Sequence, residues 1–188
     1  MSNLEKILEH NRLFVQNKEY TRYQTSKYPN KKMVILTCMD TRLLALLPKA
    51  MNINHGDTKI IKNAGAIVTH PFGSIMRSIL IAVYELNAEE VYVVGHHDCG
   101  MSKLHASSFL DQMKAQGIRE DVIDILTYSG INLDTWLTGF NSVEESVQNS
   151  VHMIKNHPLF SAHIPVHGLV IHPETGKLDV IVDGSNRR

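Results

Sequence analysis

Residues 33–42 read MVILTCMDTR, and residues 91–100 read VYVVGHHDCG. In each segment a short apolar run is followed at once by polar side chains, among them cysteine, histidine and aspartate. Short apolar runs of this kind are typical of buried strands in a parallel sheet. The carboxyl ends of neighbouring parallel strands meet at one edge of the sheet, where open α/β folds bind ligands. We therefore expect the two polar segments to form a single site.

The rest of the chain alternates predicted strands with predicted helices. Periodic apolar residues predict a helix over 72–86, and a polar but amphipathic one follows Ser2. Further helices are expected over 43–47, ending before Pro48, and over 101–116. Two short helices are expected within 117–139 and one more after Ser142. Ser2 with Glu5, and Ser142 with Glu145, have the spacing of helix-capping boxes.

Three more strands are predicted, and the last two form a hairpin. They cover residues 59–62, 166–171 and 178–182, with a turn over 173–176. The predicted fold class is α/β, with a mostly parallel central sheet, helices on both faces and an antiparallel C-terminal hairpin at one edge. We expect one domain over 1–188, with residues 1–30 forming an N-terminal helical arm.

Composition excludes several classes of partner. The chain has 188 residues, and 19 basic side chains balance 19 acidic ones. This balance favours neither nucleic acid nor an anionic membrane surface. No apolar run approaches the ~20 residues that span a bilayer, and the first residues do not resemble a signal peptide. We therefore expect a cytoplasmic protein, in which the two cysteines stay reduced.

Those two cysteines, Cys38 and Cys99, form a candidate zinc site together with His96. Thiolate and imidazole are the ligands that zinc prefers, and three protein ligands leave a fourth position for water. Asp40 is placed to accept a hydrogen bond from that water, and Arg42 to hold Asp40 in an ion pair. In a closed state, Asp40 would instead become the fourth ligand.

Other interpretations of these residues stay open. The cysteines and the histidine could be ordinary core residues, or ligands of a purely structural zinc. Cys38 and Cys99 could form a disulfide after metal loss. Asp40 and Arg42 could be a structural ion pair, and His97 and Asp98 are interpreted as a packed or solvated pair.

The motifs Cys38-x-Asp40-x-Arg42 and His96-x-x-Cys99-Gly100 resemble those of the β-class carbonic anhydrases. The resemblance extends from about Met33 to the C-terminus. The residues of the motifs are most similar to those of the small, archaeal-like branch and of bacterial carbonic anhydrase-like proteins. It implies a zinc lyase in which a zinc-bound hydroxide hydrates carbon dioxide reversibly to bicarbonate, with Asp40 and Arg42 orienting the hydroxide or gating the metal. It also implies a homodimer, with a dimer of dimers as a further option, whose N-terminal helix lies across the partner.

Three departures from the family pattern leave the substrate open. Ala66 stands where many members have Asn, and His97 where Thr or Ser is common. Residues 69–73, THPFG, also differ from the small branch. The resemblance places the substrate site near Gly65 and Ala66, with His97 and His70 as candidate proton relays. The alternative functions are hydrolysis of another small heterocumulene, such as carbonyl sulfide or carbon disulfide, and a slow zinc-binding homologue that acts as a regulatory or binding module.

Overall fold

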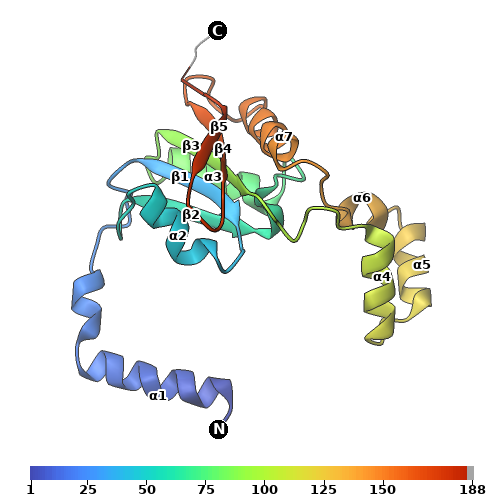
Figure 1. Ribbon diagram of the computed structural model, residues 1–188, viewed down its shortest axis with the longest axis horizontal. Coiled ribbons are helices and arrows are strands. Elements are labelled where there is room, and N and C mark those ends of the chain that lie inside the picture. Colours follow the sequence, from blue (N-terminus) through green and yellow to red (C-terminus); the bar gives the residue numbers. More distant parts are fainter. Residues whose placement is uncertain (186–188) are drawn as a thin grey trace.

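The central element is a five-stranded sheet with strand order β2-β1-β3-β4-β5 (Figure 1). The structure, a computed structural model, describes residues 1–185. Its strands are β1 (Met33–Cys38), β2 (Thr58–Asn63), β3 (Glu90–His96), β4 (Val166–Ile171) and β5 (Leu178–Val182). The pairs β1–β2, β1–β3 and β3–β4 are parallel, and β5 pairs antiparallel with β4. The predicted parallel sheet with an antiparallel hairpin edge is thus confirmed.

Seven α-helices and two short 3-10 helices accompany these strands in the described part of the chain. They are α1 (Asn3–Gln16), η1 (Glu19–Tyr23), α2 (Leu43–Ala50), η2 (Ala64–Ala66), α3 (Ser74–Tyr84), α4 (Ala106–Ala115), α5 (Glu120–Tyr128), α6 (Leu133–Leu137) and α7 (Val143–Lys155). Helices α1 and η1 precede β1, and the others lie between strands. Among residues 1–185, none of these helices has the length and apolar character needed to cross a membrane.

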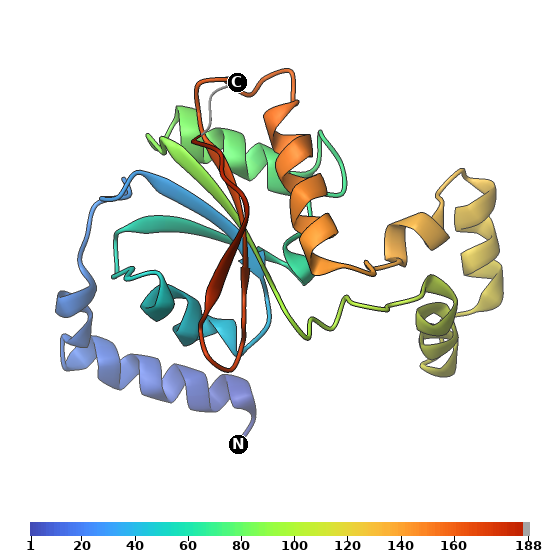
Figure 2. The same ribbon diagram turned by 45° about the horizontal axis from the view of Figure 1, so that its top comes forward.

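Alternate residues of the strands pack on two faces of the sheet. Val34 and Leu36 of β1 point to the face covered by α3 and α7, where Met76 and Ile154 complete the core. Ile35 and Cys38 belong to the other cluster, which α2 covers. Figure 2 shows α2 on one side of the sheet and α3 with α7 on the other. Helices on both faces bury the central strands, which explains why β1 is almost continuously apolar.

Glycine lets α7 approach the sheet closely beside the candidate site. A Cβ atom on Gly95 would lie 2.8 Å from Cγ2 of both Val143 and Val147. A Cβ on Gly168, in the adjacent strand β4, would lie 2.7 Å from Cγ1 of Val147. The absence of side chains at these positions therefore sets the distance between α7 and the strand that carries His96.

Two helical segments extend away from the sheet. Helix α1 has no buried residue, and Leu4, Ile7 and Leu8 on it are 64%, 63% and 58% exposed. Helices α4 to α6 form a second projection, in which Trp136 is exposed (Figures 1 and 2). Both projections thus present apolar side chains that this chain does not cover.

The helix boundaries correct some of the sequence predictions. Helix α2 does not stop before Pro48 but continues through it to Ala50. Helix α4 begins at Ala106 rather than at residue 101, because residues 101–105 form turns that pair with Phe140 through Ser102 and Lys103. The capping box at Ser2 is confirmed. At Ser142 the hydroxyl caps the Glu145 N–H, but it donates to Glu144 rather than forming the full box.

Candidate metal site

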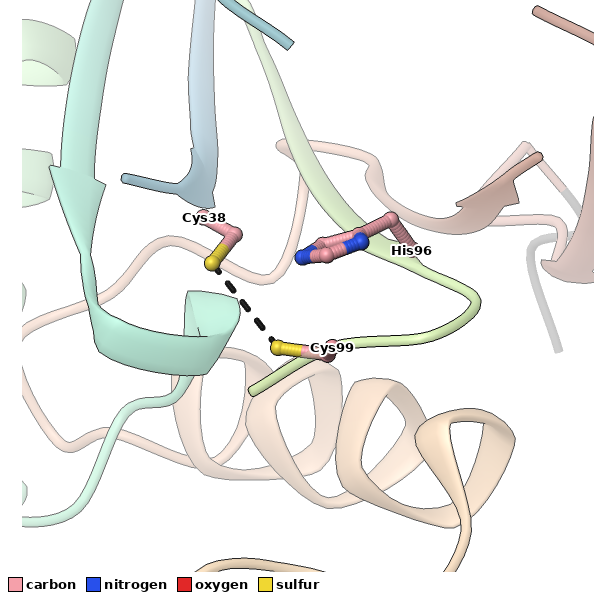
Figure 3. A group of neighbouring side chains, drawn as sticks. All are labelled: Cys38, His96 and Cys99. Carbon is pink, nitrogen blue, oxygen red and sulfur yellow. Dashed lines mark hydrogen bonds between the residues drawn. The ribbon is translucent and has the colours of Figure 1, made fainter. Parts of the chain in front are cut away.

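Cys38, His96 and Cys99 converge at the carboxyl edge of the sheet (Figure 3). Cys38 ends β1, His96 ends the neighbouring strand β3, and Cys99 lies in the loop that follows. Within residues 1–185 they form a cluster of possible metal ligands, in which the ligand atoms all lie within 4.8 Å of one another. All three residues are buried. The two sulfur atoms are 3.8 Å apart. The parallel topology thus brings together residues that are 61 positions apart in the chain.

The imidazole of His96 is oriented for ligation. Its Nδ1 lies 2.8 Å from the backbone oxygen of His97. A carbonyl oxygen only accepts hydrogen bonds, so Nδ1 carries the proton and Nε2 keeps its lone pair. Nε2 is buried and has no hydrogen-bond partner among residues 1–185. A buried nitrogen without a partner beside two sulfur atoms fits a metal ligand better than a satisfied core histidine.

The two thiols differ in how readily they ionise. The hydrogen bond from Cys99 lowers the pKa of Cys38 to about 4, although burial acts in the opposite direction. The backbone N–H of Gly65 also donates to the Cys38 sulfur, at 3.4 Å. The pKa of Cys99 is raised, first by its hydrogen bond to Cys38 and then by burial. Burial alone would lower the pKa of His96, but the Cys38 thiolate and the His97 carbonyl raise it. One thiolate is therefore already favoured at neutral pH.

Asp40 rests on Arg42 beside this cluster. Arg42 donates from Nε to Asp40 Oδ1 at 3.0 Å and from Nη2 to Asp40 Oδ2 at 2.8 Å. These bonds lower the pKa of Asp40 to about 2. Asp40 Oδ2 is nevertheless only 3.8 Å from His96 Nε2. An ionised carboxylate thus lies at the edge of the cluster, held by a guanidinium.

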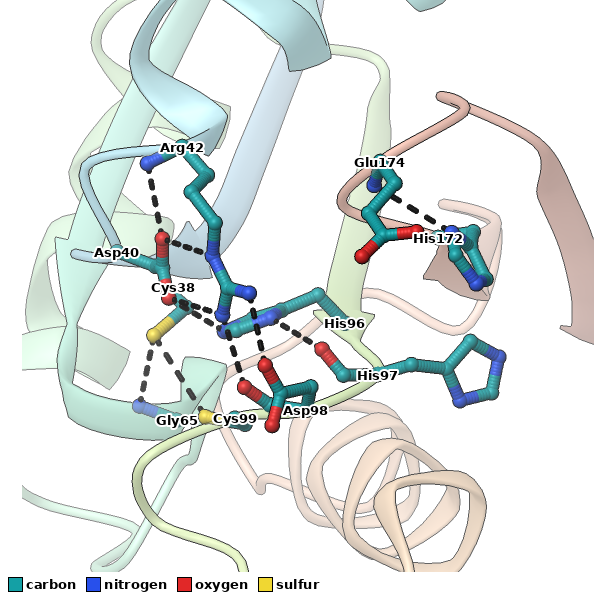
Figure 4. Close-up of polar contacts among 10 residues, drawn as sticks. All are labelled: Cys38, Asp40, Arg42, Gly65, His96, His97, Asp98, Cys99, His172 and Glu174. Atoms are coloured by element: carbon teal, nitrogen blue, oxygen red, sulfur yellow. Dashed lines mark hydrogen bonds and ion pairs between the residues drawn. The ribbon is translucent and has the colours of Figure 1, made fainter.

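The site contains contacts that the sequence did not predict. Asp98, interpreted as a packed or solvated residue, accepts a hydrogen bond from Arg42 (Figure 4). The only sequence signal was its position directly before Cys99. The contact from Gly65 to Cys38 was also missed, although Gly65 and Ala66 are the residues that the family resemblance places near the substrate site. Its turn is fixed by hydrogen bonds between the Asn63 side chain and the backbone of Ile67.

The two candidate proton relays lie apart from the ligand atoms. The His97 side chain points away from the cysteines and towards His172, with ring centroids 5.9 Å apart (Figure 4). His70 lies in the turn before α3 and accepts a hydrogen bond from the Phe72 N–H. His97, unlike His70, lines a cleft of about 270 Å³ that also reaches His96 and Cys99. Glu144 at the start of α7 lines the same cleft, whereas Gly65 and Ala66 do not.

Comparisons with known proteins agree with this geometry. The family pattern described as carbonic anhydrase matches residues 33–178. The chain is 64% identical over 184 residues to a Bacillus subtilis protein named "Putative carbonic anhydrase YvdA". The match covers 98% of this chain and 93% of that protein. It is 26% identical over 155 residues to carbon disulfide hydrolase of Acidithiobacillus thiooxidans, covering 79% of this chain and 76% of that protein.

A solved structure gives the same result. The crystal structure of β-carbonic anhydrase isoform I from Trichomonas vaginalis superposes with a TM-score of 0.88 and 34% sequence identity. The alignment covers 98% of this chain and 100% of that chain. The chain therefore belongs to the β-class carbonic anhydrase family.

Proposed function

We propose that this protein catalyses the zinc-dependent, reversible hydration of carbon dioxide to bicarbonate. The observation that carries the proposal is the buried Nε2 of His96. It has no hydrogen-bond partner in the described part of the chain and lies within 4.8 Å of the sulfur atoms of Cys38 and Cys99. Two sulfurs and one imidazole nitrogen are a donor set suited to zinc. A zinc ion held there would activate water for nucleophilic attack and stabilise the developing negative charge.

Asp40 and Arg42 have separate roles in this proposal. Asp40 stays ionised because Arg42 lowers its pKa to about 2, so at neutral pH it accepts but cannot donate a hydrogen bond. It would therefore orient the attacking water through one of that water's protons. Arg42 holds the carboxylate back from the ligand atoms. When Asp40 leaves Arg42, it would take the fourth ligand position and close the site.

The test is stopped-flow hydration of carbon dioxide on protein whose zinc content has been measured. We expect one zinc per chain and catalysis well above the uncatalysed rate. Asp40→Asn should retain zinc but lower kcat/KM by roughly 10- to 100-fold, the usual effect of losing a residue that orients a metal site. Protein that holds zinc yet does not accelerate hydration would refute the enzymatic proposal and favour the binding or regulatory module.

A matched control is available on β5. Asp179 is paired with Lys177 at 2.8 Å, two residues away, as Asp40 is with Arg42, but it lies outside the cluster. Asp179→Asn should leave kcat/KM unchanged. Carbon disulfide and carbonyl sulfide belong in the same assay, because a carbon disulfide hydrolase is among the relatives. Faster turnover of either compound than of carbon dioxide would reassign the substrate.

We further propose that residues 1–188 form one domain that assembles as a cytoplasmic homodimer, with residues 1–30 as an arm on the partner. The exposed apolar residues Leu4, Ile7 and Leu8 of α1 support this assembly, because a second copy would cover them. Two thiols kept as potential zinc ligands support a reducing compartment.

A further inference from the structure

Arg42 is held by two carboxylates rather than one. Besides its three bonds to Asp40, from the backbone N–H, Nε and Nη2, it donates from Nη1 to Asp98 Oδ2 and from Nη2 to the backbone oxygen of Asp98, both at 2.8 Å. Figure 4 shows the guanidinium lying between the two aspartates, next to the cysteines. The Asp40–Arg42 pair used in the proposed function is therefore one half of a larger arrangement.

The two halves differ in what they connect. Asp40 and Arg42 are two residues apart in one turn, so their contact is local and does not tie the guanidinium to any other segment. Asp98 is 56 positions from Arg42 and lies in the loop between His96 and Cys99. Among the contacts of Arg42 within residues 1–185, only those to Asp98 tie the guanidinium to this loop. They thus fix where Arg42 sits relative to two of the three candidate ligands.

The backbone of Asp98 is shaped for this contact. Asp98 has φ 52°, in the left-handed region that aspartate and asparagine tolerate better than most residues. In this conformation its own carbonyl and its carboxylate both accept from one guanidinium. A single residue therefore supplies two hydrogen bonds to Arg42, which reduces the freedom of a side chain that is 39% exposed.

We propose that Asp98 is a positioning residue that holds Arg42 in place and, through Arg42, keeps Asp40 away from the metal ligands. This inference rests on the proposed function. Asp40 Oδ2 is already 3.8 Å from His96 Nε2, so a carboxylate released by Arg42 has only a short way to move. Without Asp98, Arg42 would sample solvent, and Asp40 would close the fourth position more often.

Asp98 also repels Asp40, but this effect is the weaker one. The Asp98 side chain is 85% exposed, so water and salt screen its repulsion of a carboxylate that it does not contact. Its direct contacts with Arg42 are charge-assisted hydrogen bonds, which depend less on long-range fields. Exposed ion pairs are weak, and we expect a shift of roughly two- to five-fold between the two positions of Asp40.

The experiment measures access to the fourth position rather than turnover. The protein is loaded with Co²⁺, and azide is titrated while the visible absorption of the cobalt is recorded. Asp98→Gly removes the carboxylate, and glycine accepts φ 52° without strain. We expect the azide Kd to rise roughly two- to five-fold. Asp98→Asn retains a side-chain oxygen acceptor and should restore most of the affinity.

Two further variants separate positioning from a general structural effect. Asn87, at φ 59° and outside the site, offers the control Asn87→Gly, which should leave the azide Kd unchanged. In an Asp40→Asn background, Asp98→Gly should no longer weaken azide binding, because the group that competes for the position is gone. A loss of affinity that persists in this background would overturn the proposal.

The outcomes distinguish this inference from the proposed function. An unchanged azide Kd in cobalt-loaded Asp98→Gly refutes the positioning role alone, and carbon dioxide hydration by the zinc protein can still stand. Failure of the wild-type protein to bind cobalt or zinc at one ion per chain refutes the metal site, and the role of Asp98 falls with it.

Discussion

The close packing of α7 on β3 makes Gly95→Ala a direct test of how the fold supports the site. The new Cβ would lie 2.8 Å from two methyl carbons, Cγ2 of Val143 and of Val147. Carbon atoms pack best at about 3.5–4.0 Å, so α7 or β3 must shift by roughly 0.7–1.2 Å. Overpacking of this kind typically costs about 1–3 kcal/mol. We therefore expect the free energy of unfolding to fall by about 2 kcal/mol.

Thermal unfolding followed by circular dichroism measures this effect. For a domain of this size, about 2 kcal/mol corresponds to a fall in Tm of roughly 4–8 °C. The matched control is Gly100→Ala, five positions further along, where an added Cβ meets no atom within 4 Å. That variant should unfold within about 0.5 kcal/mol of the wild type.

A double-mutant cycle tests the cause. Val147→Ala removes one of the two methyl groups that the new Cβ would meet, so Gly95→Ala should cost less in that background, by about 0.5 kcal/mol or more. An unchanged Tm for Gly95→Ala, or the same cost in both backgrounds, would refute the packing argument.

Three other predictions follow from the metal cluster, α1 and the turn before β2. Removing zinc with a chelator should lower the Tm of the wild-type protein, because a bound ligand present at about 100 times its Kd adds about 2.7 kcal/mol to the free energy of unfolding. The Tm of Cys99→Ser should not respond to the chelator. If the Tm of Cys99→Ser responded to chelator and to added zinc as strongly as that of the wild type, the proposed site would be contradicted. Leu8→Glu should shift sedimentation towards a smaller species, since it places a charge on the exposed apolar face of α1, and an unchanged sedimentation coefficient would argue against an interface there. The Asn54 N–H donates to Asp57 at 2.9 Å and lowers the pKa of that carboxyl. A lowered carboxyl pKa adds stability above the ordinary value of about 3.9, so Asp57→Ala should reduce Tm at neutral pH, and the difference should vanish as the pH falls through the lowered pKa.

The sheet could be predicted because its central strands have a simple sequence signature. Residues 33–38 and 91–96 are apolar almost throughout, since both of their faces are buried, and each run ends where the polar segment begins. The two capping serines also marked helix starts correctly. Pro48 misled the prediction, because proline disfavours helix interiors but α2 tolerates it. The turns at 101–105 pair with Phe140, which lies far along the chain, and local periodicity carries no signal for such a contact.

In the candidate site, too, residue types could be predicted from the sequence, whereas contacts between distant segments could not. Residue types and spacing predicted Cys38, His96 and Cys99 as candidate metal ligands, and the parallel topology brings the three together. The resting position of Asp40 on Arg42 was left open by the sequence and is visible only in the structure. The second partner of Arg42 was missed because an aspartate beside a cysteine has no characteristic pattern of its own.

The geometry implies that metal binding and the Arg42–Asp98 contact strengthen each other. Both connect the end of β1 and the loop after it with the end of β3 and the loop after it, one through buried ligands and the other through exposed charges. The exposed contact alone is too weak to fix the two loops. A bound metal would remove most of their relative freedom, after which Arg42 and Asp98 would meet at a smaller entropic cost. By linkage the contact must favour metal binding to the same extent. We therefore expect Asp98 to affect the metal affinity of the site as well as the position of Asp40, although it is not itself one of the three candidate ligands.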